Sequence, residues 1–137
     1  MNELKILDKL LTKVHSKFIY KFDEDNYGVI EDWRSKAKEV MQGRKFVDDC
    51  DGFAMTMCEL MLEYGFDPAS VSFIVCETET GEGHAIAGYT DERTTWIAEN
   101  RYYDVYDWNK RSGYKYFYFM KFDEPGQWYK VNNDDGR

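Results

Sequence analysis

The feature that most constrains the fold is a helical pattern of apolar residues between Asp49 and Tyr64. Apolar side chains recur there at the spacing that places them on one face of an α-helix. They are Cys50, Phe53, Ala54, Met57, Cys58, Met61 and Tyr64. Asp48 or Asp49 can cap the start of this helix, and Gly65 can end it, since glycine tolerates the left-handed backbone of a helix C-terminus. We therefore predict a buried helix with Cys50 in its first turn.

Two further helices are predicted ahead of it. The first ends between Lys17 and Tyr20, because apolar residues recur at helical spacing before that point. They are Leu4, Leu7, Leu10, Leu11, Val14 and Phe18. The acidic segment Lys21 to Gly28 is predicted to be a loop, and Glu31 to Met41 a second short helix that Gly43 ends.

Strands are predicted in the second half of the chain. Val71 to Cys76 follows the turn residues Asp67 and Pro68, and His84 to Tyr89 forms a hairpin with Thr95 to Glu99. Tyr114 to Phe122 is predicted to be a central strand with both faces largely covered. Helices first and an antiparallel sheet afterwards indicate an α+β domain. The helix that begins near Cys50 is expected to pack on this sheet.

The composition limits the number of domains and the kinds of partner. A chain of 137 residues, 43% of them hydrophobic, can bury one core and is too short for two ordinary domains, so residues 1–137 are expected to form a single domain. A net charge of -8 argues against nucleic-acid binding, which needs clustered Lys and Arg. No apolar run is long enough to span a membrane, and the N-terminus lacks the pattern of a signal peptide, so a cytoplasmic location is expected.

The chemistry of the chain centres on its three cysteines, Cys50, Cys58 and Cys76, which show no CxxC spacing and are predicted to be reduced thiols rather than disulfides or zinc ligands. The dipole and free N–H groups of a helix N-terminus favour a thiolate, the nucleophilic form of cysteine. Cys50 has that position. The pattern also fits a second interpretation, in which Cys50 is a core residue, because free cysteine is often fully buried. Cys58 and Cys76 are predicted to be core residues.

His84 is the candidate base for Cys50. It is the first residue of a predicted strand, directly after the flexible Gly81-Glu82-Gly83. A histidine on a strand can accept the proton of a cysteine on a helix. A merely packed or exposed strand histidine is the alternative interpretation. The other histidine, His15, lies on the outer helix, where a solvated or capping role is expected.

Glu99 and Asn100 are the candidates to orient His84. An even-numbered hairpin loop centred on Glu92 and Arg93 puts Glu99 across from Ile86, on the face that His84 shares. An odd-numbered loop or a bulge would select Asn100 instead. The alternative for Glu99 is an ordinary charged residue at a strand end.

These motifs together resemble the bacterial transglutaminase-like cysteine proteinases, over roughly Gly28 to Asp104. The resemblance rests on Asp49-Cys50-Asp51-Gly52-Phe53-Ala54 at a helix start, on Gly83-His84-Ala85-Ile86, and on Trp96-Ile97-Ala98-Glu99-Asn100. The family has the order Cys, His, Asp, on a helix start of the type Gly-Asp-Cys-Glu-Asp-Tyr-Ala, a His-Ala-Val strand and a Leu-Asp-Asn ending.

The resemblance implies a papain-like or transglutaminase-like core, covering about residues 28–122. It also implies that Cys50 is the nucleophile, His84 the base and Glu99 the orienting acid, with Asn100 matching the asparagine that follows in the family. This chain departs from the family pattern at Glu99, where the family has Asp, and at Gly52, where an acid is usual. It also lacks the export signal of many relatives.

The acidic residues Asp48, Asp49 and Asp51 around the thiol oppose thiolate formation, so a cation is expected to offset them. Arg44 and Lys45 are one source. The other is Ca²⁺ on Asp49 and Asp51, which the resemblance implies, since some relatives hold calcium beside the cysteine. Solvated acids that cap the helix are the alternative.

The predicted function is acyl transfer through a thioester, most simply as a peptidase or amidase on a protein or peptide substrate. The Cys50 N–H and a second donor, for which Trp33 is the candidate, would hold the oxyanion. A group of aromatic residues could line a cleft beside Asn100 or only pack the core: Tyr102, Tyr103, Tyr106 and Trp108. Two other functions stay open: a protein-crosslinking transglutaminase, and a catalytically silent protein-binding module of viral origin acting in a host cytoplasm.

Overall fold

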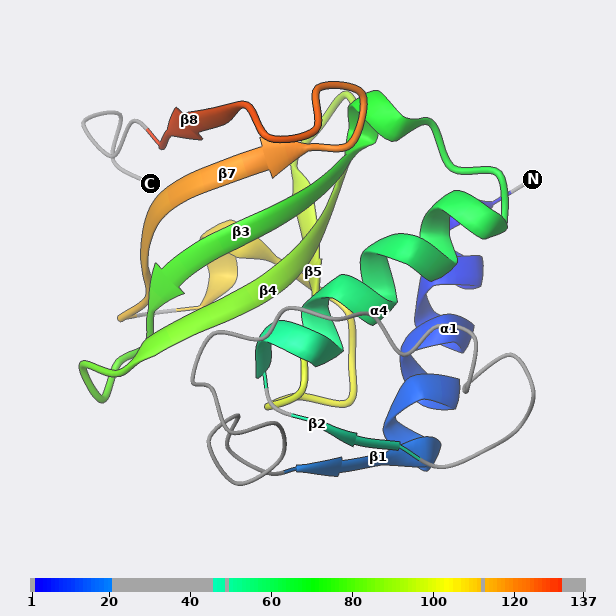
Figure 1. The fold of residues 1–137 in the computed structure, drawn as a ribbon, viewed down its shortest axis with the longest axis horizontal. Coiled ribbons are helices and arrows are strands. Elements are labelled where there is room, and N and C mark those ends of the chain that lie inside the picture. Colours follow the sequence, from blue (N-terminus) through cyan, green and yellow to red (C-terminus); the bar gives the residue numbers. More distant parts are fainter. Residues whose placement is uncertain (1, 21–45, 49, 112, 132–137) are drawn as a thin grey trace.

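Two helices lie on one face of a six-stranded antiparallel sheet in the computed structural model, which describes residues 2–20, 46–48, 50–111 and 113–131 (Figure 1). The helices are α1 (Glu3–Lys17) and α4 (Cys50–Glu63). The strands of the sheet are β3 (Val71–Glu77), β4 (Gly83–Thr90), β5 (Thr95–Ala98), β6 (Tyr106–Asp107), β7 (Lys115–Lys121) and β8 (Trp128–Lys130), in the order β6-β5-β4-β3-β7-β8. The predicted α+β class is confirmed.

Shorter elements complete the described chain. The strands β1 (Phe18–Tyr20) and β2 (Phe46–Asp48) form a separate parallel pair directly after α1. The 3-10 turns η1 (Pro68–Ser70) and η2 (Trp108–Lys110) each begin after an aspartate whose side chain accepts a backbone N–H. The predicted helix at Glu31 to Met41 and the predicted loop at Lys21 to Gly28 lie outside the described residues.

The helix α4 follows the apolar pattern of the sequence closely. Five of the seven expected core positions are buried: Phe53, Ala54, Met57, Cys58 and Met61. The expectation is wrong for Tyr64, which follows the last helical residue and is 50% exposed. Gly65 has a φ of 89°, and the N–H groups of Gly65 and Phe66 bond the carbonyls of Leu62 and Met61, which is the Schellman motif expected at a helix end.

The helix α1 packs beside α4 and covers part of the same sheet face (Figure 1). Its apolar stripe Leu7, Leu10, Leu11 and Val14 is buried, as its spacing predicts. Asn2 caps the start, since its side-chain oxygen accepts the N–H groups of Leu4 and Lys5.

The β4–β5 hairpin fixes the position of Glu99. Thr90 pairs with Thr95 and Ala87 with Ala98, so the loop between them has an even number of residues. Continuing this register one residue further sets Glu99 level with Ile86, as the even-loop alternative predicts. Asp91 stabilises the turn, because its side chain accepts the N–H groups of Arg93 and Thr94 at 2.8 and 3.0 Å.

Two apolar clusters cover the two faces of the sheet. On the helix face, Ala85, Ala87 and Ala98 present only methyl groups, and α4 lies close to the backbone of β4. On the opposite face, Ile74, Ile86 and Ile97 pack with buried tyrosines that follow β5 in the chain. By strand alternation, His84 and Glu99 belong to this second face.

The strand β7 differs from the prediction. It was expected to be covered on both faces, but Phe117 and Tyr118 are 37% and 50% exposed. The pairing of β3 with β7 shifts register between Val75 and Cys76, which inserts an extra residue into β7 and breaks the simple alternation. The short strand β8, which the sequence pattern does not predict, pairs with the other edge of β7.

Candidate active site

Cys50 is the first residue of α4, where the N–H groups of the first turn have no partner within the helix. Its side chain is half-buried, and its Sγ lies 3.7 Å from Oδ1 of Asp51. The helix dipole favours a thiolate at this position, whereas the neighbouring carboxylate opposes it. Cys50 is thus half-buried at the start of the helix, whereas Cys58 and Cys76 are buried.

Cys58 and Cys76 are buried thiols with a different environment. Cys58 donates to the carbonyl of Ser72 at 3.3 Å, and burial raises the pKa of its thiol far above the ordinary value. Burial also raises the pKa of the Cys76 thiol, as do the nearby Glu99 and Cys50. Both stay protonated at neutral pH, so they are poor nucleophiles, as expected for core residues. Cys76 pairs directly across from His84 in the sheet, which the sequence pattern does not predict.

His84 and Glu99 form a buried pair. The His84 Nε2 lies 2.6 Å from Oε1 of Glu99, and the two residues are 8% and 1% exposed. Because a carboxylate oxygen only accepts, Nε2 carries the hydrogen, which leaves Nδ1 of the neutral imidazole with a free lone pair. A histidine held in this tautomer is suited to accept a proton at Nδ1.

Two tyrosine hydroxyls complete the surroundings of the Glu99 carboxylate. Tyr106, on β6, donates to Oε2, and Tyr114, just before β7, lies 3.1 Å from both oxygens. Burial, followed by the charge of Glu99, raises the pKa of each phenol well above its ordinary value. Both tyrosines therefore remain hydrogen-bond donors at neutral pH.

A cavity of about 280 Å³ brings the candidate residues together. It is lined by Cys50, Thr78, Glu82, Gly83, His84, Asn100 and Arg101. Its residues come from the start of α4, the β3–β4 turn, the start of β4 and the turn after β5. The proposed nucleophile and base thus line one cavity, although they lie 34 positions apart in the sequence.

Asn100 lines the same cavity. Its Oδ1 is buried and has no hydrogen-bond partner among the described residues. The side chain bonded to His84 is therefore that of Glu99, rather than that of Asn100.

His15 has a role that the sequence did not reveal. Its Nε2 lies 3.0 Å from the carbonyl oxygen of Glu99 and 2.8 Å from that of Tyr102, and both oxygens accept. Its ring packs between Phe53 and Tyr103, with centroid distances of 4.9 and 4.4 Å. His15 thus ties α1 to the turn that carries Glu99, rather than being solvated.

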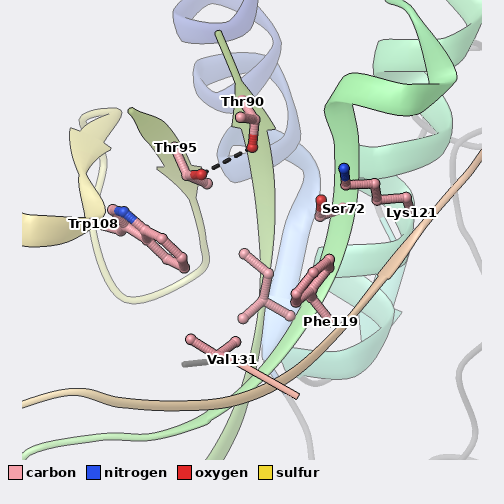
Figure 2. A pocket seen from close by; sticks show the side chains of 8 residues that line it. Ser72, Thr90, Thr95, Trp108, Phe119, Lys121 and Val131 are labelled. Carbon is pink, nitrogen blue, oxygen red and sulfur yellow. Dashed lines mark hydrogen bonds between the residues drawn. The ribbon is translucent and has the colours of Figure 1, made fainter. Parts of the chain in front are cut away.

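The four aromatic residues suggested for a cleft have separate roles. Tyr106 bonds Glu99, Tyr102 stacks under the guanidinium of Arg111 at 3.7 Å, and Tyr103 is largely exposed. Trp108 lines a second cavity, of about 250 Å³, on the sheet face opposite the helices. Figure 2 shows this cavity, with a hydrogen bond between Thr90 and Thr95 at one wall. It contains neither a thiol nor an imidazole.

Two predicted site residues, Trp33 and Asp49, lie outside the described residues, as do Arg44 and Lys45. Within the described part of the chain, no three His, Cys, Asp or Glu side chains gather where they could hold a metal ion. The same residues include no helix with the length and apolar character needed to cross a membrane.

This chain is similar to known proteins in sequence and in fold. Residues 1–136 match the family described as bacterial transglutaminase-like cysteine proteinase (BTLCP), which confirms the resemblance found in the motifs. LapG of Legionella pneumophila has a similar fold, with a TM-score of 0.71 at 16% identity, over 97% of this chain and 72% of LapG.

Two further LapG structures are similar. The calcium-bound form matches with a TM-score of 0.71 at 16% identity, over 93% of this chain and 68% of that one. The EGTA-treated form matches with a TM-score of 0.72 at 16% identity, over 95% and 68%. A comparison with curated proteins gives no match.

Proposed function

The chain belongs to the bacterial transglutaminase-like cysteine proteinases, a cysteine peptidase family, and from this we propose that it hydrolyses peptide bonds with Cys50 as nucleophile, His84 as base and Glu99 as the residue that orients His84. Protein or peptide substrates follow from the family. The observation that carries the assignment is the 2.6 Å contact between His84 and Glu99 in the wall of the cavity that also contains Cys50.

The first half of the reaction forms a thioester. The Cys50 thiol gives its proton to Nδ1 of His84, and the sulfur attacks the substrate carbonyl carbon to form a tetrahedral oxyanion. The backbone N–H of Cys50, at the start of α4, is one donor to this oxyanion, and Trp33 remains the candidate for the other. His84 then gives the proton to the leaving amine as the carbon–nitrogen bond breaks.

The second half releases the acyl group. Water loses a proton to His84 and attacks the thioester carbon, and the sulfur leaves as the carboxylic acid forms. Glu99 stabilises the imidazolium during both halves, because its carboxylate accepts from Nε2. An amine in place of water would give transamidation, so product analysis with and without a primary amine separates the two activities.

The assignment is tested by thiol reactivity. Iodoacetamide at neutral pH should label Cys50 much faster than Cys58 and Cys76, which act as references within the same molecule, and His84→Ala should slow the labelling of Cys50. Mass spectrometry of the digested protein measures all three rates. Equal rates for the three cysteines, or no effect of His84→Ala, would overturn the assignment.

Calcium binding is a separate part of the proposal, with Asp49 and Asp51 as ligands. The solved LapG structures include a calcium-bound form, and carboxylates suit this ion. Asp51 is the one ligand candidate within the described residues, and calcium takes about six to eight oxygens, so no catalytic step is assigned to the ion. Millimolar CaCl₂ should raise the melting temperature, EGTA should reverse the rise, and Asp51→Asn should reduce it. An unchanged melting temperature in CaCl₂ would refute the assignment of Asp49 and Asp51 as calcium ligands.

A further inference from the structure

We propose that Tyr106 and Tyr114 are positioning residues for catalysis, which hold the Glu99 carboxylate in the orientation that bonds His84, and that Arg101 holds Tyr114 in place. This inference rests on the proposed function of His84 and Glu99. It extends the site from the two residues in hydrogen-bond contact to the group of side chains that fixes them.

The Glu99 carboxylate needs such support because its side chain is long and fully buried. His84 contacts only Oε1, so this bond alone leaves Oε2 without a partner. A buried carboxylate oxygen without a donor costs considerable free energy. Tyr106 donates to Oε2, and Tyr114 bridges both oxygens at 3.1 Å. Together the two hydroxyls define the plane and the rotation of the carboxylate.

The direction of each hydrogen bond follows from the chemistry of Arg101. A guanidinium can only donate, so the Tyr114 oxygen accepts from Nη1 of Arg101 at 2.8 Å. The single hydrogen of Tyr114 is then directed to Glu99. A chain of donors thus runs from Arg101 through Tyr114 to the carboxylate, and each bond polarises the next.

Arg101 is itself fixed in position. Its two terminal nitrogens bond the two carboxylate oxygens of Glu79 at 2.9 and 2.6 Å, in the paired geometry that orients a guanidinium most firmly. Arg101 also lines the cavity that contains Cys50. Glu79 lies close to solvent, so a change there leaves the buried carboxylate of Glu99 untouched.

Tyr116 offers a matched control for these tyrosines. It is buried, it lies two residues after Tyr114, and its hydroxyl donates to the carbonyl of Trp108 at 2.8 Å. Replacing Tyr116 by Phe removes a buried hydroxyl and a hydrogen bond of similar length. A general loss of packing or stability should therefore appear equally in Tyr116→Phe and in Tyr114→Phe.

The test measures hydrolysis of p-nitrophenyl acetate by the full chain. Tyr106→Phe and Tyr114→Phe should each lower kcat by about tenfold and change KM little. This factor corresponds to the loss of one hydrogen bond to a charged group. Tyr116→Phe should stay near the wild-type value, and Glu79→Gln should lower kcat by a smaller factor. In a Glu99→Asp background, Tyr114→Phe should have little further effect, because the shorter side chain already loses the contact.

The outcomes separate this inference from the proposed function. If His84→Ala abolishes hydrolysis but the three tyrosine variants behave alike, the positioning role is wrong and the assignment of the base stands. If His84→Ala leaves hydrolysis unchanged, both fail. If Tyr106→Phe or Tyr114→Phe does not fold, Glu79→Gln tests the role of Arg101. An unchanged kcat in Glu79→Gln would refute the proposal that Arg101 holds Tyr114 in place.

Discussion

The substitution Glu99→Gln tests the site most directly, because it keeps the shape of the side chain and changes only its charge and hydrogen-bonding pattern. Three donors converge on the Glu99 carboxylate, namely Nε2 of His84 and the hydroxyls of Tyr106 and Tyr114. A carboxylate can accept from all three, whereas an amide has one accepting oxygen and one donating nitrogen. At least one donor must therefore face the amide nitrogen.

The size of the effect follows from that mismatch. One unsatisfied buried donor costs about 1–3 kcal/mol, so Glu99→Gln should lower the free energy of unfolding by that amount. The value of kcat should fall by roughly 10²–10⁴-fold, because His84 loses both its tautomer preference and the charge that stabilises the imidazolium. Binding of a substrate in the cavity changes less, since Glu99 is 1% exposed and does not line it.

Two measurements check this prediction. Urea unfolding gives the change in stability, and ester hydrolysis together with iodoacetamide labelling of Cys50 gives the change in reactivity. Tyr116→Phe is the control for a general effect of losing a buried hydrogen bond. A variant that keeps wild-type kcat while losing stability would show that Glu99 is a structural residue and refute the catalytic reasoning.

Three other substitutions have defined outcomes. His15→Ala should lower the free energy of unfolding by about 1–3 kcal/mol, because two backbone carbonyls lose their donor; a denaturation midpoint equal to wild type contradicts this. The hydrogen bonds from Arg101 lower the pKa of Glu79 from 4.5 to about 2, so the stabilisation from this pair is complete above pH 4.5 and is lost as the pH falls toward 2. The stability difference between wild type and Glu79→Gln should vanish over that range, and a difference that persists at pH 2 would exclude the linkage. Gly88→Ala should destabilise the sheet by about 1–3 kcal/mol, since the added Cβ would lie 2.8 Å from Cδ1 of Ile74. Thermal unfolding measures this loss, and Gly83→Ala is the control, because a Cβ added there meets no atom within 4 Å.

Much of the scaffold could be predicted because it depends on local patterns. The apolar spacing predicts which faces of α1 and α4 are buried, and the turn residues between the two strands predict the hairpin. The register of the hairpin comes from the structure, in which a four-residue turn runs from Asp91 to Thr94, and this register decides between the alternatives for the partner of His84. A hydrophobic period is a property of a short stretch of chain, so it can be recognised without the rest of the fold.

The strand β7 shows the limit of such patterns. The alternation of its residues predicts that both faces are covered. The strand has a bulge and is second from the edge of the sheet, and Tyr118 is 50% exposed. The local sequence predicts neither feature. The burial of a strand face depends on which elements pack on it, and a bulge depends on how the strand pairs with its neighbour.

The order of Cys50, His84 and Glu99 along the chain, the helix and the strand that carry Cys50 and His84, and the strand that Glu99 follows were determined by the sequence itself. Only the tertiary structure decided what surrounds them: the hydroxyls of Tyr106 and Tyr114 on Glu99, and the bond from His15 to the following turn. These contacts join elements distant in sequence, and a tyrosine in a strand has the same local pattern whether its hydroxyl meets water or a buried carboxylate. Long-range packing alone makes that difference, because it sets which polar groups lose water together.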